Sequence, residues 1–354
     1  ALPIKYGTLM EDFRDALNEE QFVKGPYLEA TPPFVHCVYT YTQLIEQGLL
    51  ADGWKKALGP DFPADRKPYL HQFRAFEQVI KRDRNLIVAT GTGSGKTEAF
   101  LVPIIDHLLR QKQDNTLTPG SGVRALLLYP MNALANDQLK RLRELLHKLP
   151  DITFGRYTGD TRNTCNAAKT YYRQEHGNAT RFREPLQNEL ISREQMHETP
   201  PHILLTNYAM LEYLMLRPQA SPLFEGDQWR FIVADEAHTY DGARGIEVAM
   251  LLRRLKDRVV SSEPDRLRCI ATSATLGTEE GSSDKIAKFA TELFSECFDE
   301  GDVVEGERKH LSTSASQTSS CSLSPELLEQ ITDRVAQHDT DYETLAQLAF
   351  SHDV

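Results

Sequence analysis

A glycine-rich stretch at residues 90–97 constrains the fold of this chain more than any other feature of its sequence. It reads Thr-Gly-Thr-Gly-Ser-Gly-Lys-Thr, follows the apolar run 86–89 and precedes the apolar run 99–102. These three pieces predict a strand, a tight turn and the start of a helix. Such a turn directs backbone N–H groups and a helix N-terminus at one point, where a polyphosphate binds. The sequence therefore predicts a P-loop.

The side chains of this loop suit a nucleoside triphosphate. Lys96 can reach the β- and γ-phosphates, and the hydroxyl of Thr97 can hold Mg²⁺. Thr90 departs from the general P-loop pattern, which has glycine there. The competing interpretation is a glycine-rich turn without function, and the Lys-Thr pair and the flanking elements argue against it. The predicted nucleotide-binding residues of the loop are Thr92, Gly93, Ser94, Gly95, Lys96 and Thr97.

A second pattern lies about 140 residues further along the chain. The apolar run 229–234 predicts a buried strand, and Asp-Glu-Ala-His follows at its end. Open α/β sheets place their chemistry at the carboxyl ends of the strands. There Asp235 can bind Mg²⁺ through water, and Glu236 can orient and deprotonate the attacking water. Together with Lys96 and His238 they are the predicted catalytic residues, and the pairing with the P-loop predicts ATP hydrolysis.

The order of the motifs adds a family resemblance. Gly-Ser-Gly-Lys-Thr, Asp-Glu-Ala-His and Ser-Ala-Thr (273–275) resemble motifs I, II and III of superfamily 2 DEAH-box helicases. His71-Gln72 resembles the glutamine motif, which implies that Gln72 reads adenine. The segments 129–138, 157–161 and 206–208 resemble motif Ia and later strand-contacting motifs. The resemblance covers residues 65–280 and implies that nucleic-acid contact or coupling falls to Asn132, Gly159, Thr206, Asn207, Ser273 and Thr275.

Within that superfamily the motif sequences are similar to those of large bacterial DEAH helicases of the mitomycin-repair and phage-defence-island type. The segments 27–34, 129–134, 206–213 and 235–243 carry this finer match. Motif Ia differs from the RNA-helicase DEAD-box form at Met131 and Asn132. The resemblance implies DNA rather than RNA as the favoured polymer, and a role in defence or repair with partner proteins of those systems.

The apolar pattern predicts an α/β fold. Strands and helices alternate over residues 65–280, which indicates a RecA-like P-loop NTPase domain with a parallel sheet and helices on both faces. The predicted strands are 86–89, 125–129, 203–206, 231–234 and 268–272, and the predicted helices are 99–110, 135–149 and 246–259. A polar stretch at 162–200 is expected to be a surface insertion with some helix.

Two flanking regions complete the predicted organisation. Residues 1–64 are expected to be a mostly helical accessory arm that packs against the core. Residues 281–354 are expected to be helical apart from a Ser-rich loop at 311–324. The sequence contains no Gln-x-x-Gly-Arg-x-x-Arg motif, which in the resembled family lies on a second RecA-like lobe. We therefore expect that lobe elsewhere in the same full-length chain.

Composition limits the remaining choices. The 354 residues carry a net charge of −11, so tight autonomous binding of nucleic acid would need a locally basic face. Scattered cysteines, an odd five in number, favour reduced thiols, and no apolar run is long enough to predict a membrane span. We expect a cytoplasmic ATP-driven motor on DNA that uses ATP and Mg²⁺. The alternatives are an RNA remodeller of the same fold and a non-catalytic ATP-binding scaffold, which the intact acidic pair and P-loop disfavour.

Overall fold

The apolar runs of the sequence form a parallel sheet in the computed structural model, which describes residues 32–91, 93–118, 120, 122–177, 181–274 and 282–309. Within these residues the sheet has eight strands in the order β4-β3-β5-β2-β6-β7-β1-β8. The strands are β1 (Leu86–Ala89), β2 (Ala125–Tyr129), β3 (Phe154–Arg156), β4 (Glu189–Leu190), β5 (Ile203–Asn207), β6 (Phe231–Ala234), β7 (Arg268–Ser273) and β8 (Val303–Glu305).

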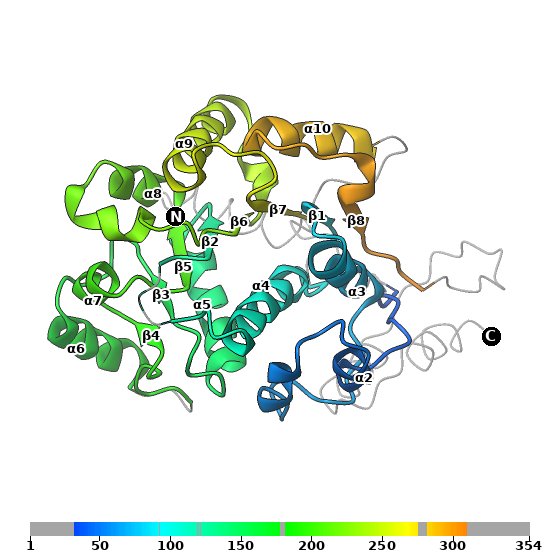
Figure 1. Cartoon of the computed structure of the whole chain (residues 1–354), viewed down its shortest axis with the longest axis horizontal. Helices are drawn as coiled ribbons and strands as arrows, with labels where there is room; N and C mark the ends of the chain where they lie inside the picture. Colours follow the sequence, from blue (N-terminus) through cyan, green and yellow to red (C-terminus); the bar gives the residue numbers. More distant parts are fainter. Residues whose placement is uncertain are drawn as a thin grey trace, which may run out of the picture. The chain divides into compact units, whose positions relative to one another are not determined.

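The central strands are apolar on both sides because helices cover both faces of the sheet. In β1, Leu86 and Val88 join the core on one face, whereas Ile87 and Ala89 join the core on the other. Figure 1 shows the sheet between the two groups of helices. One face packs against α3 (Leu70–Phe76), α4 (Lys96–Gln113) and α5 (Asn132–Leu146), and the other against α8 (Tyr208–Met215), α9 (Gly242–Val260) and α10 (Ser282–Phe294). The predicted α/β architecture is confirmed.

The stretch 162–200 is more than a surface insertion. It contains α6 (Cys165–His176), the edge strand β4 and α7 (Arg193–Glu198). Strand β4 pairs with β3 in the register Phe154↔Glu189. The Glu189 carboxylate is buried and accepts from the Arg143 guanidinium of α5 at 2.7 Å. A two-residue strand has no apolar alternation of its own, so only its pairing with β3 and this buried ion pair define it.

Residues 34–307 form one compact unit. The boundaries predicted at residues 64 and 280 fall inside this unit. Before residue 64, α2 (Tyr41–Glu46) and a short 3₁₀ helix at Asp52–Lys56 precede α3. Trp54 stacks on Phe62 at 5.2 Å and donates from its indole N–H to Asp106 of α4 at 3.2 Å. This segment is thus part of the core packing around α4.

Several predicted features lie outside the described residues. They include the Ser-rich loop 311–324 and residues 1–31 of the N-terminal arm. Among the described residues, no helix combines the length and apolar character that crossing a membrane requires.

Candidate nucleotide and nucleic-acid site

The P-loop has the geometry that its glycines predict. Strand β1 ends at Ala89, and α4 begins at Lys96 with Gly95 as its N-cap. Gly93 and Gly95 both have φ of +72°, in the left-handed region that favours glycine. A Cβ on Gly95 would also lie 2.4 Å from Nε2 of Gln72. The turn therefore requires glycine at residue 95 for two separate reasons. Thr92, a predicted phosphate-loop residue, lies outside the described residues.

The side chains of Thr90, His71 and Gln72 form hydrogen bonds that fix the conformation of the loop. The Thr90 and Ser94 hydroxyls are 2.5 Å apart, so Thr90 forms an internal bond of the loop at the position where the general pattern has glycine. His71 Nε2 bonds to the Ser94 carbonyl at 2.8 Å, and Gln72 Nε2 donates to the Gly95 carbonyl at 3.0 Å. Gln72 is fully buried, and its predicted contact with adenine stays a prediction.

The acidic pair follows β6, as predicted. Asp235 is only 6% exposed, and its backbone N–H donates to Leu128 of the neighbouring β2 at 3.0 Å. Burial raises the pKa of Asp235, and a hydrogen bond from the Thr272 hydroxyl opposes that rise. Glu236 has φ +48° and ψ +47°, which is left-handed backbone at a residue other than glycine. Its N–H donates to the same Thr272 hydroxyl at 3.0 Å.

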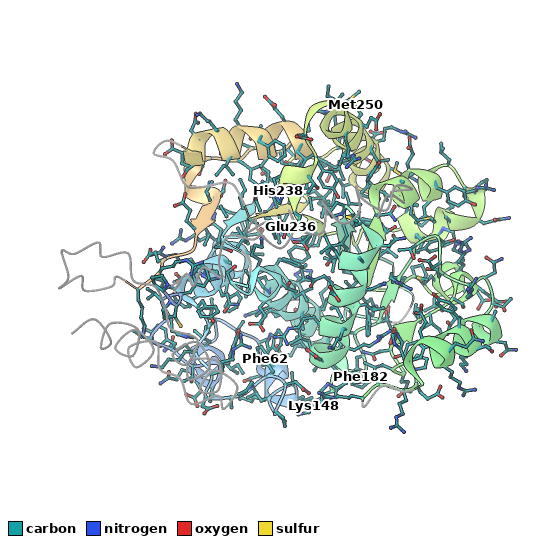
Figure 2. All side chains as sticks on the ribbon, turned by 180° about the vertical axis from the view of Figure 1, so that it is seen from behind. Phe62, Lys148, Phe182, Glu236, His238 and Met250 are labelled. Carbon is teal, nitrogen blue, oxygen red and sulfur yellow. The ribbon has the colours of Figure 1, made fainter. Side chains whose placement is uncertain are left out.

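Motifs I, II and III converge on one point. Lys96 Nζ lies 3.1 Å from Glu236 Oε1, although the two residues are 140 positions apart in sequence. His238 Nδ1 lies 3.4 Å from Glu236 Oε2 and 3.3 Å from the Ser273 hydroxyl. Figure 2 shows Glu236 and His238 side by side. The carbonyl of Ser273 also accepts from the N–H of Thr90 at 3.1 Å, so motif III contacts both the P-loop and the acidic motif.

A Mg²⁺ site fits the side chains found here. Mg²⁺ in nucleotide sites is held by one or two carboxylates, phosphate oxygens and several waters. Asp235 supplies a carboxylate at the carboxyl end of β6, and Thr97 supplies a hydroxyl in the first turn of α4. The described residues contain no group of three or more His, Cys, Asp or Glu that could hold a metal. The donor set thus suits an ion that arrives with a phosphate ligand.

Four of the six residues predicted for nucleic-acid contact or coupling lie at a second position on the same edge of the sheet, whereas Ser273 lies in the phosphate site. Asn207, the N-cap of α8, donates from Nδ2 to Oδ1 of Asn132 at 2.7 Å. The buried Thr206 hydroxyl donates to the Tyr157 carbonyl at 2.7 Å, and a Cβ on Gly159 would meet open space. These residues lie at the carboxyl ends of β2, β3 and β5, whereas the phosphate site lies at the carboxyl ends of β1, β6 and β7. Thr275 lies outside the described residues.

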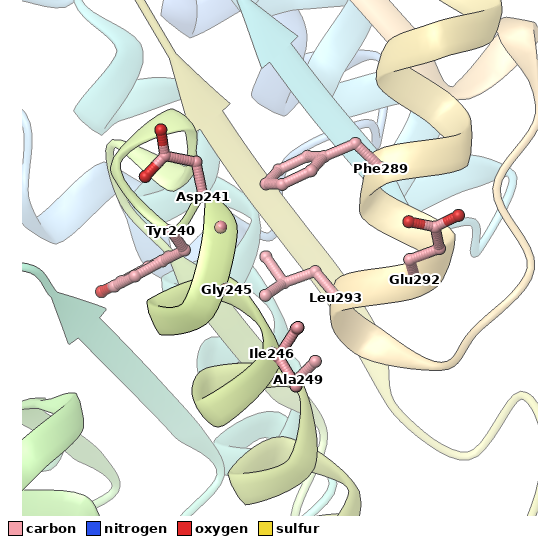
Figure 3. Close-up of a pocket in the computed structure, with 9 residues that line it drawn as sticks. Tyr240, Asp241, Gly245, Ile246, Ala249, Phe289, Glu292 and Leu293 are labelled. Atoms are coloured by element: carbon pink, nitrogen blue, oxygen red, sulfur yellow. The ribbon is translucent and has the colours of Figure 1, made fainter.

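One cavity among the described residues lies apart from this chemistry. It has a volume of about 280 Å³ between α9 and α10. Figure 3 shows Phe289 and Leu293 of α10 facing the α9 side of the pocket, where Ile246 and Ala249 lie. None of the predicted catalytic or nucleotide-binding residues lines it.

Sequence reasoning missed two side chains of the site. Thr272 connects the backbone of Glu236 to the carboxylate of Asp235, yet inside an apolar strand it resembles an ordinary core residue. Arg193 of α7 donates to the Gly159 carbonyl at 3.3 Å, and its guanidinium carbon lies 5.4 Å from the Tyr157 ring centroid. Arg193 lies 34 positions beyond Gly159 in the sequence, so no local pattern indicated this contact.

Comparisons with known proteins agree with this geometry. The DEAD/DEAH box helicase family model matches residues 69–282. The chain is 30% identical to the Druantia protein DruE of Escherichia coli (strain UMEA 4076-1) over 82% of its length, and 31% identical to the uncharacterized ATP-dependent helicase YprA of Bacillus subtilis over 59%. It spans only 20% and 23% of those two proteins. The crystal structure of the DUF1998 helicase MrfA bound to DNA and AMPPNP matches 83% of this chain and 33% of MrfA, with 25% identity and a TM-score of 0.53.

Proposed function

Because this chain belongs to the DEAD/DEAH box helicase family, we propose that it is the ATP-hydrolysing first lobe of a motor that translocates on or unwinds DNA. The observation that carries the proposal is the 3.1 Å contact between Lys96 and Glu236, which places the phosphate-binding cation and the candidate base at one point. In this proposal a second RecA-like lobe of the same full-length chain closes the site.

The residues divide the chemistry of hydrolysis among them. The P-loop N–H groups and Lys96 would bind the β- and γ-phosphates of ATP, and Thr97 and Asp235 would hold Mg²⁺. When bound, Mg²⁺ neutralises phosphate charge. Glu236 orients a water for attack on the γ-phosphorus and accepts its proton. The bond to the β-phosphate bridging oxygen breaks, and that oxygen leaves with ADP.

His238 positions the base in this proposal. Its Nδ1 lies within 3.4 Å of both the Glu236 carboxylate and the Ser273 hydroxyl. The side chain therefore links the acidic motif to motif III. Because Ser273 ends β7 and also contacts the P-loop through its backbone, His238 can restrict the direction of the Glu236 carboxylate.

The nucleic-acid strand would cross the ends of β2, β3 and β5. Asn132, Gly159 and Asn207 supply short polar groups there, which contact phosphates without adding formal charge. The Thr206 hydroxyl is buried, so it supports the Tyr157 backbone behind this surface instead. Beside these groups Arg217 lies 4.4 Å from the ring centroid of the 39% exposed Tyr213. Exposed aromatic rings and guanidinium planes stack on bases, so this pair would extend the contact.

The choice of DNA and the biological setting rest on the relatives. The matched MrfA structure contains DNA, and at 25% identity it supports DNA as the polymer. The proposed role in defence or repair, with partners from those systems, rests on the motif resemblance together with the similarity to DruE and MrfA. The proposed cytoplasmic location rests on the scattered cysteines. These finer assignments are part of the proposal.

ATPase assays of the full-length protein test the proposal. We expect turnover that single-stranded DNA stimulates more than RNA does, and Lys96→Ala should abolish turnover without changing the melting temperature. Stronger stimulation by RNA would favour the RNA remodeller instead. ATP binding without turnover would favour the scaffold, and unchanged turnover in a folded Lys96→Ala variant would refute the site.

A further inference from the structure

A buried carboxylate lies directly behind the P-loop. Glu98 occupies the first turn of α4, two residues after Lys96, and is only 3% exposed. Burying a charged carboxylate is costly unless other groups pair with it. Its position next to the phosphate-binding residues makes the identity of its partners relevant to the site.

Three groups pair with Glu98, each from a different segment. Arg66 binds it through both guanidinium nitrogens, at 3.0 and 2.7 Å. Arg141 of α5 donates to Oε1, and Gln72 donates to Oε2 at 3.2 Å. The same Gln72 amide donates to the Gly95 carbonyl at 3.0 Å. Glu98 is therefore one side chain away from the backbone of the phosphate loop.

Arg141 connects this cluster to the proposed nucleic-acid position, because it lies on the helix that begins there. Helix α5 begins at Asn132, whose side chain bonds to Asn207 at 2.7 Å. Arg141 lies nine positions after Asn132, which corresponds to about 14 Å along the helix. A displacement of α5 at its nucleic-acid end would therefore move the guanidinium that Glu98 binds.

We propose that Glu98 and Arg141 are positioning residues that couple nucleic-acid binding to the P-loop. The connection runs from Asn207 and Asn132 along α5 to Arg141, and from there through Glu98 and Gln72 to Gly95. This inference rests on the proposed function, because it needs a nucleic-acid ligand at the ends of β2 and β5. It assigns to Arg141 an effect on DNA-stimulated turnover and none on basal ATP binding.

The test replaces Arg141 with methionine in the full-length protein. Methionine keeps much of the aliphatic stem, and Glu98 retains Arg66 and Gln72, so we expect the variant to fold. The ratio of DNA-stimulated to basal kcat should fall about five- to tenfold, a typical size for coupling between sites. Basal kcat, the KM for ATP and the melting temperature should stay close to those of the wild type.

Two further variants sharpen the result. Arg141 also donates to Glu144 at 2.9 Å, so Glu144→Gln perturbs the same guanidinium without touching Glu98 and should leave stimulation unchanged. Arg141→Lys keeps the positive charge and should restore part of the stimulation.

The outcomes separate this inference from the function on which it rests. Wild-type stimulation in Arg141→Met would overturn the coupling alone. Equal losses of basal and stimulated turnover with a lower melting temperature would also overturn it, because Arg141 would then only pack. Absence of stimulation by DNA and RNA in the wild type would overturn both the coupling and the proposed function.

Discussion

Replacing Thr272 with valine should disconnect the two acidic residues of the site. Thr272 is fully buried on β7, where its hydroxyl accepts from the Glu236 N–H at 3.0 Å and donates to the Asp235 carboxylate. Valine keeps the branched shape and removes the hydroxyl. The substitution therefore leaves a buried charge and a buried N–H without their partner in the strand.

The magnitude follows from those two bonds. A hydrogen bond to a charged group contributes about 1.5–3 kcal/mol and a bond to a neutral backbone group about 1 kcal/mol. We therefore expect Thr272→Val to lower the free energy of unfolding by about 3 kcal/mol at neutral pH. Thr272→Ser keeps the hydroxyl and should retain most of that stability.

The pH dependence of this loss has a definite sign. Burial raises the pKa of Asp235 in the folded state, so ionisation of Asp235 costs stability as the pH rises through that pKa. Removing the Thr272 hydroxyl takes away a group that lowers this pKa. The penalty should be largest at neutral pH and shrink as acid protonates Asp235. The acid limb of kcat/KM should move to higher pH for the same reason.

Two measurements check this reasoning. Urea denaturation of the wild type, Thr272→Val and Thr272→Ser at pH 7 and pH 5 gives the stability differences. ATPase rates across a pH series at saturating Mg²⁺ give the acid limb. A valine variant as stable as the serine variant, with the same acid limb, would refute the bridging role of the hydroxyl.

Three other outcomes follow from the site and the fold. Glu236→Gln should keep ATP affinity and stall hydrolysis, because an amide cannot accept the water's proton; loss of binding, measured with a fluorescent nucleotide, would contradict that role. Ser273→Ala should reduce unwinding more than ATPase, since Ser273 contacts both His238 and the P-loop; equal losses would indicate packing only. Burial lowers the pKa of His202 to about 4, and its Nδ1 accepts from the Thr153 N–H. The contribution of neutral His202 to the free energy of unfolding is therefore fully present above pH 6.5 and is lost as the pH falls. Between pH 7 and pH 5 the loss from His202 should be about 2 kcal/mol, and His202→Gln should flatten that part of the denaturation profile.

The sequence predicts the central strands closely and the edges poorly. The expected strands 86–89, 125–129 and 231–234 agree with β1, β2 and β6 to the residue. These strands are apolar on both faces, so a short continuous apolar run in the sequence is enough to predict each of them. Strands β3, β4 and β8 have only two or three residues each and were not predicted. Their backbone pairing comes from neighbours that are distant in sequence, which no local pattern encodes.

The same limit applies to the candidate site. Motif order predicted that Lys96 and Glu236 would face each other, because both follow strands of one parallel sheet. The supporting contacts were not predictable in this way. Glu98 in the first turn of a helix is what the helix dipole favours, and nothing local indicates its partly buried partners Arg66 and Arg141. Such pairs depend on the packing of segments more than 30 residues apart.

The backbone at Glu236 connects this packing to the chemistry. Left-handed backbone at a residue other than glycine costs about 1–3 kcal/mol and persists only where the surroundings hold it. Here Thr272 accepts from the Glu236 N–H, and Thr239 donates to the Glu236 carbonyl from its backbone N–H at 2.9 Å and its hydroxyl at 2.8 Å. These bonds fix the direction of the Glu236 side chain toward Lys96. Strain held by surrounding bonds positions a base in advance, so the orientation of the candidate base is built into the fold before any substrate binds.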